Sequence, residues 1–128
     1  MRCALLLFAL VLGGCASGGT EEQSKPPLDL LRDAGFKCSA KAASTAENFT
    51  VTNEVCSVEG EEVELYTFKD TGAIRNWYSM YASLTCSVFP GTTFYNVEKG
   101  LSVISPQTKT LADKIADGID ADVHEINC

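Results

Sequence analysis

The sequence predicts a small α+β domain in which an antiparallel sheet carries two main helices on one face and disulfides brace the fold. Three observations predict this class. Short segments alternate apolar and polar residues and are joined by tight turns, as in antiparallel strands that bury one face. Two longer segments repeat apolar residues at helical spacing. Four cysteines from position 38 onward form an even set, which is typical of disulfides in a small exported domain.

The first elements are expected after a pair of prolines. Residues 28–33 hold three leucines and precede Gly35, which predicts one or two helical turns ended by glycine. Residues 36–40 are expected to form the first strand, and residues 41–49 a loop. These segments lead into the predicted centre of the sheet.

A β-hairpin is predicted next. Residues 50–58 and 61–68 are rich in strand-forming residues, and Gly60 supplies the turn between them. The second of these strands alternates as a half-buried strand should. One predicted face holds Val63, Leu65 and Thr67, and the other holds Glu62, Glu64 and Tyr66.

The first long helix is predicted to begin after Asp70, whose side chain can cap it, and to run to about residue 84. Its apolar residues recur every three or four positions and are expected to form one stripe against the sheet. The members of this stripe are Ile74, Trp77, Tyr81 and Leu84.

The last third of the chain predicts a second hairpin and a second helix. Residues 93–97 and 101–104 form the hairpin, and Ser105-Pro106 is a strong helix start. Residues 123–128 are expected to add a final short strand. The inner stripe of the helix is predicted from Leu111, Ile115 and Ile119.

The N-terminal segment has the pattern of a secretory signal. Arg2 precedes an apolar run over residues 4–12, and Leu12-Gly13-Gly14-Cys15 closes this run. The run is too short for a permanent transmembrane helix, which needs about 20 apolar residues. The Leu-Gly-Gly-Cys ending resembles the lipobox of bacterial lipoproteins. This resemblance implies that Cys15 receives a diacylglycerol and becomes the mature N-terminus.

The expected organisation has three parts: a signal peptide over residues 1–14, a lipidated flexible tether over residues 15–27, and one domain over residues 28–128. Fatty-acyl chains such as palmitate at Cys15 would hold the protein on the cell membrane or outer membrane, facing the periplasm or the exterior. An ordinary signal peptide cut after Ala16 or Gly19 would instead release the protein.

The charge of the predicted mature chain argues against nucleic-acid binding. Removal of the segment that contains Arg2 leaves nine basic residues against seventeen acidic ones, a net charge of −8. Such a surface repels nucleic acid and anionic headgroups. No nucleic-acid partner is therefore expected.

The four remaining cysteines allow three pairings, and we favour Cys38–Cys56 and Cys86–Cys128. The first pair would close a strand–loop–strand unit, and the second would tie the C-terminus to the middle of the chain. A zinc site is disfavoured because no CxxC pair occurs and His124 is the single histidine. No metal site and no cofactor are expected.

No catalytic set is visible, so we expect no enzyme. The serines lack a Gly-x-Ser-x-Gly setting, and a triad could use only His124. Two groups of acidic residues are the one candidate for a chemical site, because paired carboxylates can bind calcium or act as acid and base in glycan hydrolysis. Exposed, solvated surfaces of the fold explain both groups better. The two acidic groups are Glu59, Glu61, Glu62 and Glu64, and Asp113, Asp117, Asp120 and Asp122.

Aromatic residues give a second candidate surface. Neighbouring aromatics on one helix cannot all face the core, so an exposed patch is a possible binding surface, although small sheets also use aromatics as core filler. The candidates are Tyr66, Trp77, Tyr78 and Tyr95.

The order of motifs resembles a group of small bacterial lipoproteins of unknown function. The resemblance lies in the start at residues 34–38 (Ala-Gly-Phe-Lys-Cys), in Cys56 before an acidic strand, and in the helix that carries Trp77. The expected anchor and tether, together with the lack of a catalytic set, lead us to expect a non-enzymatic module of the cell envelope that binds another envelope protein or a cell-wall component. The alternatives are a phage-derived superinfection-exclusion lipoprotein and a carboxylate-based cell-wall hydrolase.

Overall fold

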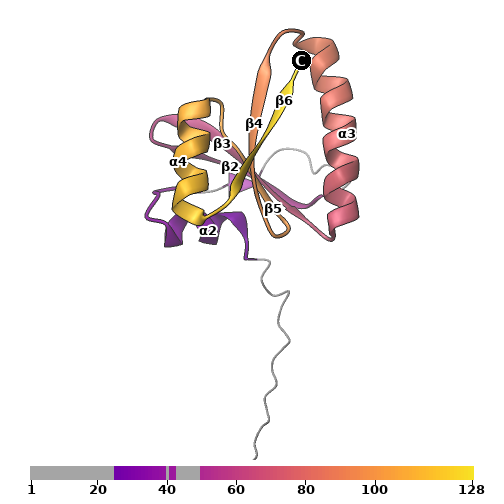
Figure 1. Ribbon diagram of the computed structural model, residues 1–128. Coiled ribbons are helices and arrows are strands. Elements are labelled where there is room, and N and C mark those ends of the chain that lie inside the picture. Colours follow the sequence, from indigo (N-terminus) through magenta and orange to yellow (C-terminus); the bar gives the residue numbers. More distant parts are fainter. Residues whose placement is uncertain (1–24, 40, 43–49) are drawn as a thin grey trace, which may run out of the picture.

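The computed structural model describes residues 25–39, 41–42 and 50–128. Six antiparallel strands form one sheet in the order β1-β2-β3-β5-β4-β6. Helices α2 and α4 lie on one side of this sheet and α3 on the other (Figure 1). The strands are β1 (Lys41–Ala42), β2 (Thr50–Val58), β3 (Glu61–Phe68), β4 (Thr93–Lys99), β5 (Ser102–Ser105) and β6 (Asp122–Asn127), and the helices are α2 (Pro27–Asp33), α3 (Thr71–Val88) and α4 (Lys109–Ile119).

The α+β class, the antiparallel sheet and the disulfide bracing are confirmed, but the placement of both main helices on one face is wrong. Leu65 packs in the cluster beneath α4, whereas the next residue, Tyr66, packs in the cluster beneath α3. Consecutive strand residues point to opposite faces of a sheet. Because the second face of β3 also ends in aromatic residues, this one strand contributes to two cores.

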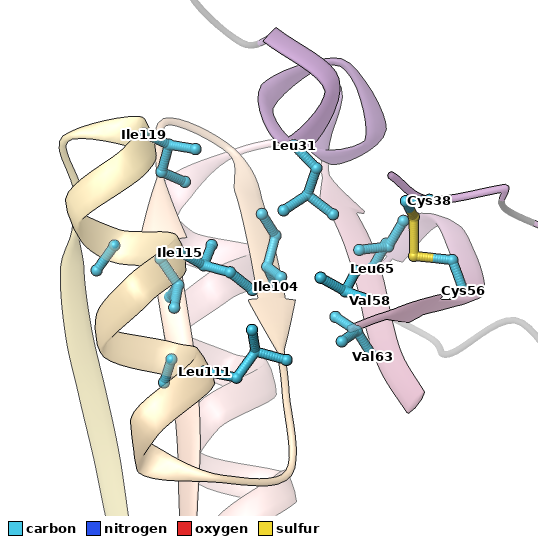
Figure 2. Close-up of a cluster of buried hydrophobic side chains, with 13 residues drawn as sticks. Leu31, Cys38, Cys56, Val58, Val63, Leu65, Ile104, Leu111, Ile115 and Ile119 are labelled. Atoms are coloured by element: carbon cyan, nitrogen blue, oxygen red, sulfur yellow. A yellow bond between two sulfur atoms is a disulfide. The ribbon is translucent and has the colours of Figure 1, made fainter. Parts of the chain in front are cut away.

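The larger core lies between the sheet and helices α2 and α4 (Figure 2). Leu111, Ile115 and Ile119 face this core from α4, which confirms the predicted inner stripe. Leu31 of α2 is also fully buried there. The sheet contributes Val58, Val63, Leu65, Val97 and Ile104.

The smaller core lies between the sheet and α3 and is built around Trp77, which is 1% exposed. Its ring centroid lies 4.8 Å from that of Tyr66 and 5.4 Å from that of Phe68, both on β3. Such ring pairs add about 0.5–1.5 kcal/mol each beyond the burial of area. Packing of Trp77 therefore stabilises the contact between the first half of α3 and the sheet.

Both predicted cysteine pairs are present. Cys38 and Cys56 are bonded across 5.6 Å between their Cα atoms, and this disulfide borders the larger core (Figure 2). Cys86 and Cys128 are bonded across 5.0 Å and join the end of α3 to the residue after β6. The two ends of the chain segment 86–128 are thereby held together.

Some element boundaries differ from those predicted. Residues 36–39 form no strand, and the short β1 falls inside the predicted loop, of which residues 43–49 lie outside the described part. Helix α4 begins after Thr108 rather than after Ser105, because Ser105 still pairs with Glu64 in the sheet. Thr108 Oγ1 caps the helix instead, accepting a hydrogen bond of 3.3 Å from the Leu111 amide. Cys15 and the predicted tether up to residue 24 also lie outside the described residues.

A carboxylate from β3 completes the start of α4. Glu61 accepts hydrogen bonds from the Thr108 amide and the Thr108 hydroxyl, each at 2.8 Å, and from the Gln107 amide. A negative charge is stabilising at a helix N-terminus, where backbone N–H groups lack helical partners. Glu61 therefore connects the β2–β3 hairpin to α4.

Replacing Glu61 with glutamine is expected to reduce the free energy of unfolding by about 1–2 kcal/mol, because it removes the charge from these three hydrogen bonds. Urea titrations followed by circular dichroism measure this change. Glu62→Gln is the matched control, since Glu62 is exposed on the opposite face of the same strand. Equal midpoints for the two variants would contradict the capping role.

Candidate binding surface

The apolar stripe of α3 divides into a buried half and an exposed half. Ile74 and Trp77 are buried against the sheet, and Tyr81 is half-buried. Leu84, the last predicted member of the stripe, is 60% exposed. The prediction that the whole stripe packs on the sheet is therefore wrong beyond Tyr81.

Three large apolar side chains form what we call the apolar ledge: Leu84, Val88 and Phe89, which are 60%, 66% and 53% exposed. Leu84 and Val88 are four residues apart and share one face of α3. Phe89 follows at the end of the helix, with its ring centroid 6.2 Å from that of Phe94 on β4. Scattered exposed apolar residues are ordinary, but a contiguous group marks an interaction site.

A cleft of about 230 Å³, which we call the acidic cleft, lies beside the ledge on the α3 side of the sheet. Glu62 and Glu64 line it from β3, and Ser105 lies opposite Glu64 in the β3–β5 register. Tyr81 and Phe94 line it from α3 and β4, with ring centroids 6.0 Å apart. Phe94 therefore contacts both the cleft and the ledge.

The predicted Glu59–Glu64 group does not form one site. Glu59 pairs with Lys114 of α4 at 2.7 Å, and Glu61 caps the same helix. Glu62 and Glu64 point to the other side of the sheet, because they alternate with Glu61 along β3. Only these two carboxylates of the group share the cleft.

Asp113 and Asp117 lie on α4, on the far side of the sheet from the cleft, whereas Asp122 is exposed on β6 and, because it alternates with Val123, projects toward the α3 side. Asp113 pairs with Lys109 at 2.9 Å on the exposed side of the helix, and Asp117 is also exposed. Asp120 ends the helix with a positive φ of 58°, a conformation that aspartate tolerates better than most residues. Asp113 and Asp117 therefore belong to a solvated helix face. Within the described residues, no three His, Cys, Asp or Glu side chains come together in a way that could hold a metal ion.

The four aromatic residues predicted as a possible surface occupy two kinds of place. Tyr66 and Trp77 are 4% and 1% exposed and belong to the smaller core, so the prediction of an accessible surface is wrong for these two. Tyr95 is half-buried and lines the acidic cleft. Tyr78 is half-buried between α3 and β6, where its ring centroid lies 4.3 Å from that of His124.

Tyr78 is the most strongly perturbed titratable residue of the described part. Its hydroxyl oxygen is buried and has no hydrogen-bond partner of good geometry among the described residues. Burial raises the pKa of the Tyr78 hydroxyl far above its ordinary value, and the negative charge of nearby Glu98 raises it further. The folded protein therefore keeps this phenol neutral.

The protein is expected to lose stability as the pH rises above about 10, the ordinary tyrosine pKa. In that range the unfolded chain ionises Tyr78 and the folded chain does not, so unfolding becomes more favourable. The loss contributed by this one group is at most about 1.4 kcal/mol per pH unit. Urea titrations at pH 8, 10 and 11 on the wild type and on Tyr78→Phe isolate the contribution of Tyr78. The free energy of unfolding should fall less steeply with pH in the variant than in the wild type. Parallel curves would contradict this.

The sequence reasoning missed the residues that join the ledge to the cleft. Phe89 and Phe94 were assigned no role, although Phe94 lies in a predicted strand and Phe89 lies a few residues past the predicted helix end at about residue 84. The available signal was that Val88-Phe89 continues the apolar spacing of α3 past residue 84.

Two further findings bear on the class of protein. None of the helices within residues 25–39 and 50–128 combines the length and the apolar character needed to span a bilayer. Comparison of the chain with protein-family models, with curated proteins and with solved structures finds no match.

Proposed function

We propose that this protein is a lipid-anchored, non-enzymatic binding module of the cell envelope, and that the apolar ledge is its binding surface. The signal-like segment that ends at Cys15 supports export and lipidation. The two disulfides fit an oxidising compartment outside the cytosol. The partner is an envelope protein or a cell-wall component, and the anchor lies in the cell membrane or outer membrane, facing the periplasm or the exterior.

The observation that carries the binding role is the exposure of the ledge. Burying Leu84, Val88 and Phe89 against a partner would remove from water three side chains that the fold leaves outside both cores. Full burial of one such side chain contributes about 1.5–3 kcal/mol. A lipid anchor would add effective concentration by holding the module at the same surface as its partner.

Mass spectrometry of the protein isolated from membranes tests the anchor. The expected mature N-terminus is Cys15 carrying acyl chains, and Cys15→Ser should abolish both the mass increment and the membrane association. A mature protein that begins at another residue, or that carries no lipid, would overturn the anchored part of the proposal.

Photo-crosslinking in intact cells tests the binding role. A photoreactive amino acid at position 84 should give a discrete crosslinked species of higher mass, whereas the same amino acid at position 117 should not. Asp117 is the control because it is exposed on α4, on the other side of the sheet. Identical crosslinking at both positions, or none at position 84, would contradict a role for the ledge.

A further inference from the structure

The acidic cleft has the chemistry to select the partner that the ledge holds. We propose that the cleft receives a basic side chain, arginine or lysine, from the partner polypeptide, while apolar residues beside that side chain cover the ledge. This inference rests on the proposed binding function and adds the chemical class of the group that is recognised.

The cleft carries negative charge without a neutralising partner in the described part of the chain. Glu62 and Glu64 are exposed, and the three ion pairs found among the described residues involve other carboxylates. Glu64 accepts a hydrogen bond from the Tyr66 hydroxyl, which orients this carboxylate without neutralising it. Two residues apart on one strand, Glu62 and Glu64 project to the same face about 6–7 Å apart.

The remaining lining favours an organic cation over a hydrated metal ion. Tyr81 and Phe94 bring aromatic rings to the cleft. Ammonium and guanidinium groups are attracted to the faces of such rings, and guanidinium also binds carboxylates through paired hydrogen bonds. Ser105 and Gln107 add polar groups at the opposite wall.

The size of the cleft favours one side chain over a whole small-molecule ligand. Sites for drug-sized ligands and cofactors enclose about 300–1,000 Å³. The volume of about 230 Å³ is below that range. A long basic side chain can enter the cleft and leave its own backbone outside, next to the ledge.

The position of the cleft explains why the occupant should be part of a polypeptide. The ring of Phe94 lies between the cleft, which it lines with Tyr81, and the ledge, where it contacts Phe89. A basic side chain in the cleft therefore places the neighbouring residues of its chain over exposed apolar surface. A free amine would use the cleft and leave the ledge uncovered.

The test is a titration of the ¹⁵N-labelled full chain, purified in neutral detergent, with capped arginine (N-acetyl-arginine amide) followed by NMR. Capped lysine, capped glutamate and N-acetylglucosamine are the comparison probes. Arginine or lysine should cause saturable shifts at the amides of Glu62, Glu64, Phe94 and Ser105, and these shifts should weaken with added salt. Glutamate should cause none.

Matched variants show which charge is responsible. Glu62→Gln is expected to weaken arginine binding about tenfold, since it replaces a charge-assisted hydrogen bond to the guanidinium by a weaker neutral one. Asp117→Asn makes the same change of net charge on the far side of the sheet and should leave binding unchanged.

Three results would overturn the inference: equal shifts from arginine and glutamate, equal binding by Glu62→Gln and the wild type, or binding of N-acetylglucosamine in place of arginine. None of these results would affect the lipid at Cys15 or a crosslink at position 84. Failure of the cation site is therefore distinguishable from failure of the proposed function.

Discussion

Replacing Trp77 with alanine is expected to reduce the free energy of unfolding by about 3–5 kcal/mol, a large part of the stability of a domain of this size. Trp77 is 1% exposed and contacts aromatic rings from β3 and from its own helix. Its removal leaves a cavity beneath the first half of α3. Urea unfolding followed by far-ultraviolet circular dichroism measures the loss.

The matched control for this variant is Leu84→Ala on the same helix. Leu84 is 60% exposed, so its truncation removes little buried area and should change stability by less than about 0.5 kcal/mol. A large destabilisation by Leu84→Ala would show that the second half of α3 is packed, and the ledge would not exist. The two variants together map where α3 leaves the core.

Removing the Cys86–Cys128 disulfide is expected to cost about 4 kcal/mol in the loop-closure model, since the bond spans 42 residues. The double variant Cys86→Ala/Cys128→Ala leaves Cys38–Cys56 intact and avoids free thiols at the cut bond. Its urea midpoint should fall well below that of the wild type under non-reducing conditions. An unchanged midpoint would contradict the assignment of this bond as a main brace.

The same variant should loosen the molecule locally. The disulfide joins the exposed end of α3 to the end of the edge strand β6. Hydrogen exchange should therefore accelerate first at residues 84–88 and 122–127, while residues 61–68 in the sheet centre keep their protection. Uniform acceleration along the chain would indicate global instability instead of local release.

Local patterns predicted most elements well. The alternation of residues 61–68, the Asp70 cap and the apolar spacing of residues 111–119 each depend on neighbours in the chain, and the structure contains the corresponding β3, α3 and α4. The pairing of the four cysteines is also confirmed. The strand and the two helices are predicted by residues within each segment itself. The cysteine pairing is predicted because four cysteines allow only three pairings.

The placement of the helices was wrong because it depends on residues that are distant in sequence. The glutamates of β3 suggested a solvated second face, yet Tyr66 and Phe68 on that same face form a core with Trp77. Only the sheet order, which places β5 next to β3, brings Val103 into this core beneath α3. One face of a strand can therefore be exposed to solvent at one end of the strand and buried at the other end.

The acidic cleft escaped prediction for a related reason. Its walls come from β3, α3, β4 and the end of β5 with the residues that follow it, and each contributes residues that look ordinary in sequence. The ledge was missed because helical spacing says which residues share a face but not how far the sheet extends beneath that face. The exposed end of α3 is set by where the contact with β3 stops.

Oxidative footprinting of residues 77–94, in purified protein and in intact cells, tests the central claim most directly. If the end of α3 is an uncovered surface that a partner occupies, Leu84, Val88 and Phe89 will be oxidised rapidly in the purified protein and protected in cells. Trp77, inside the core, will be protected in both. Equal oxidation of the three ledge residues in both settings would contradict the account.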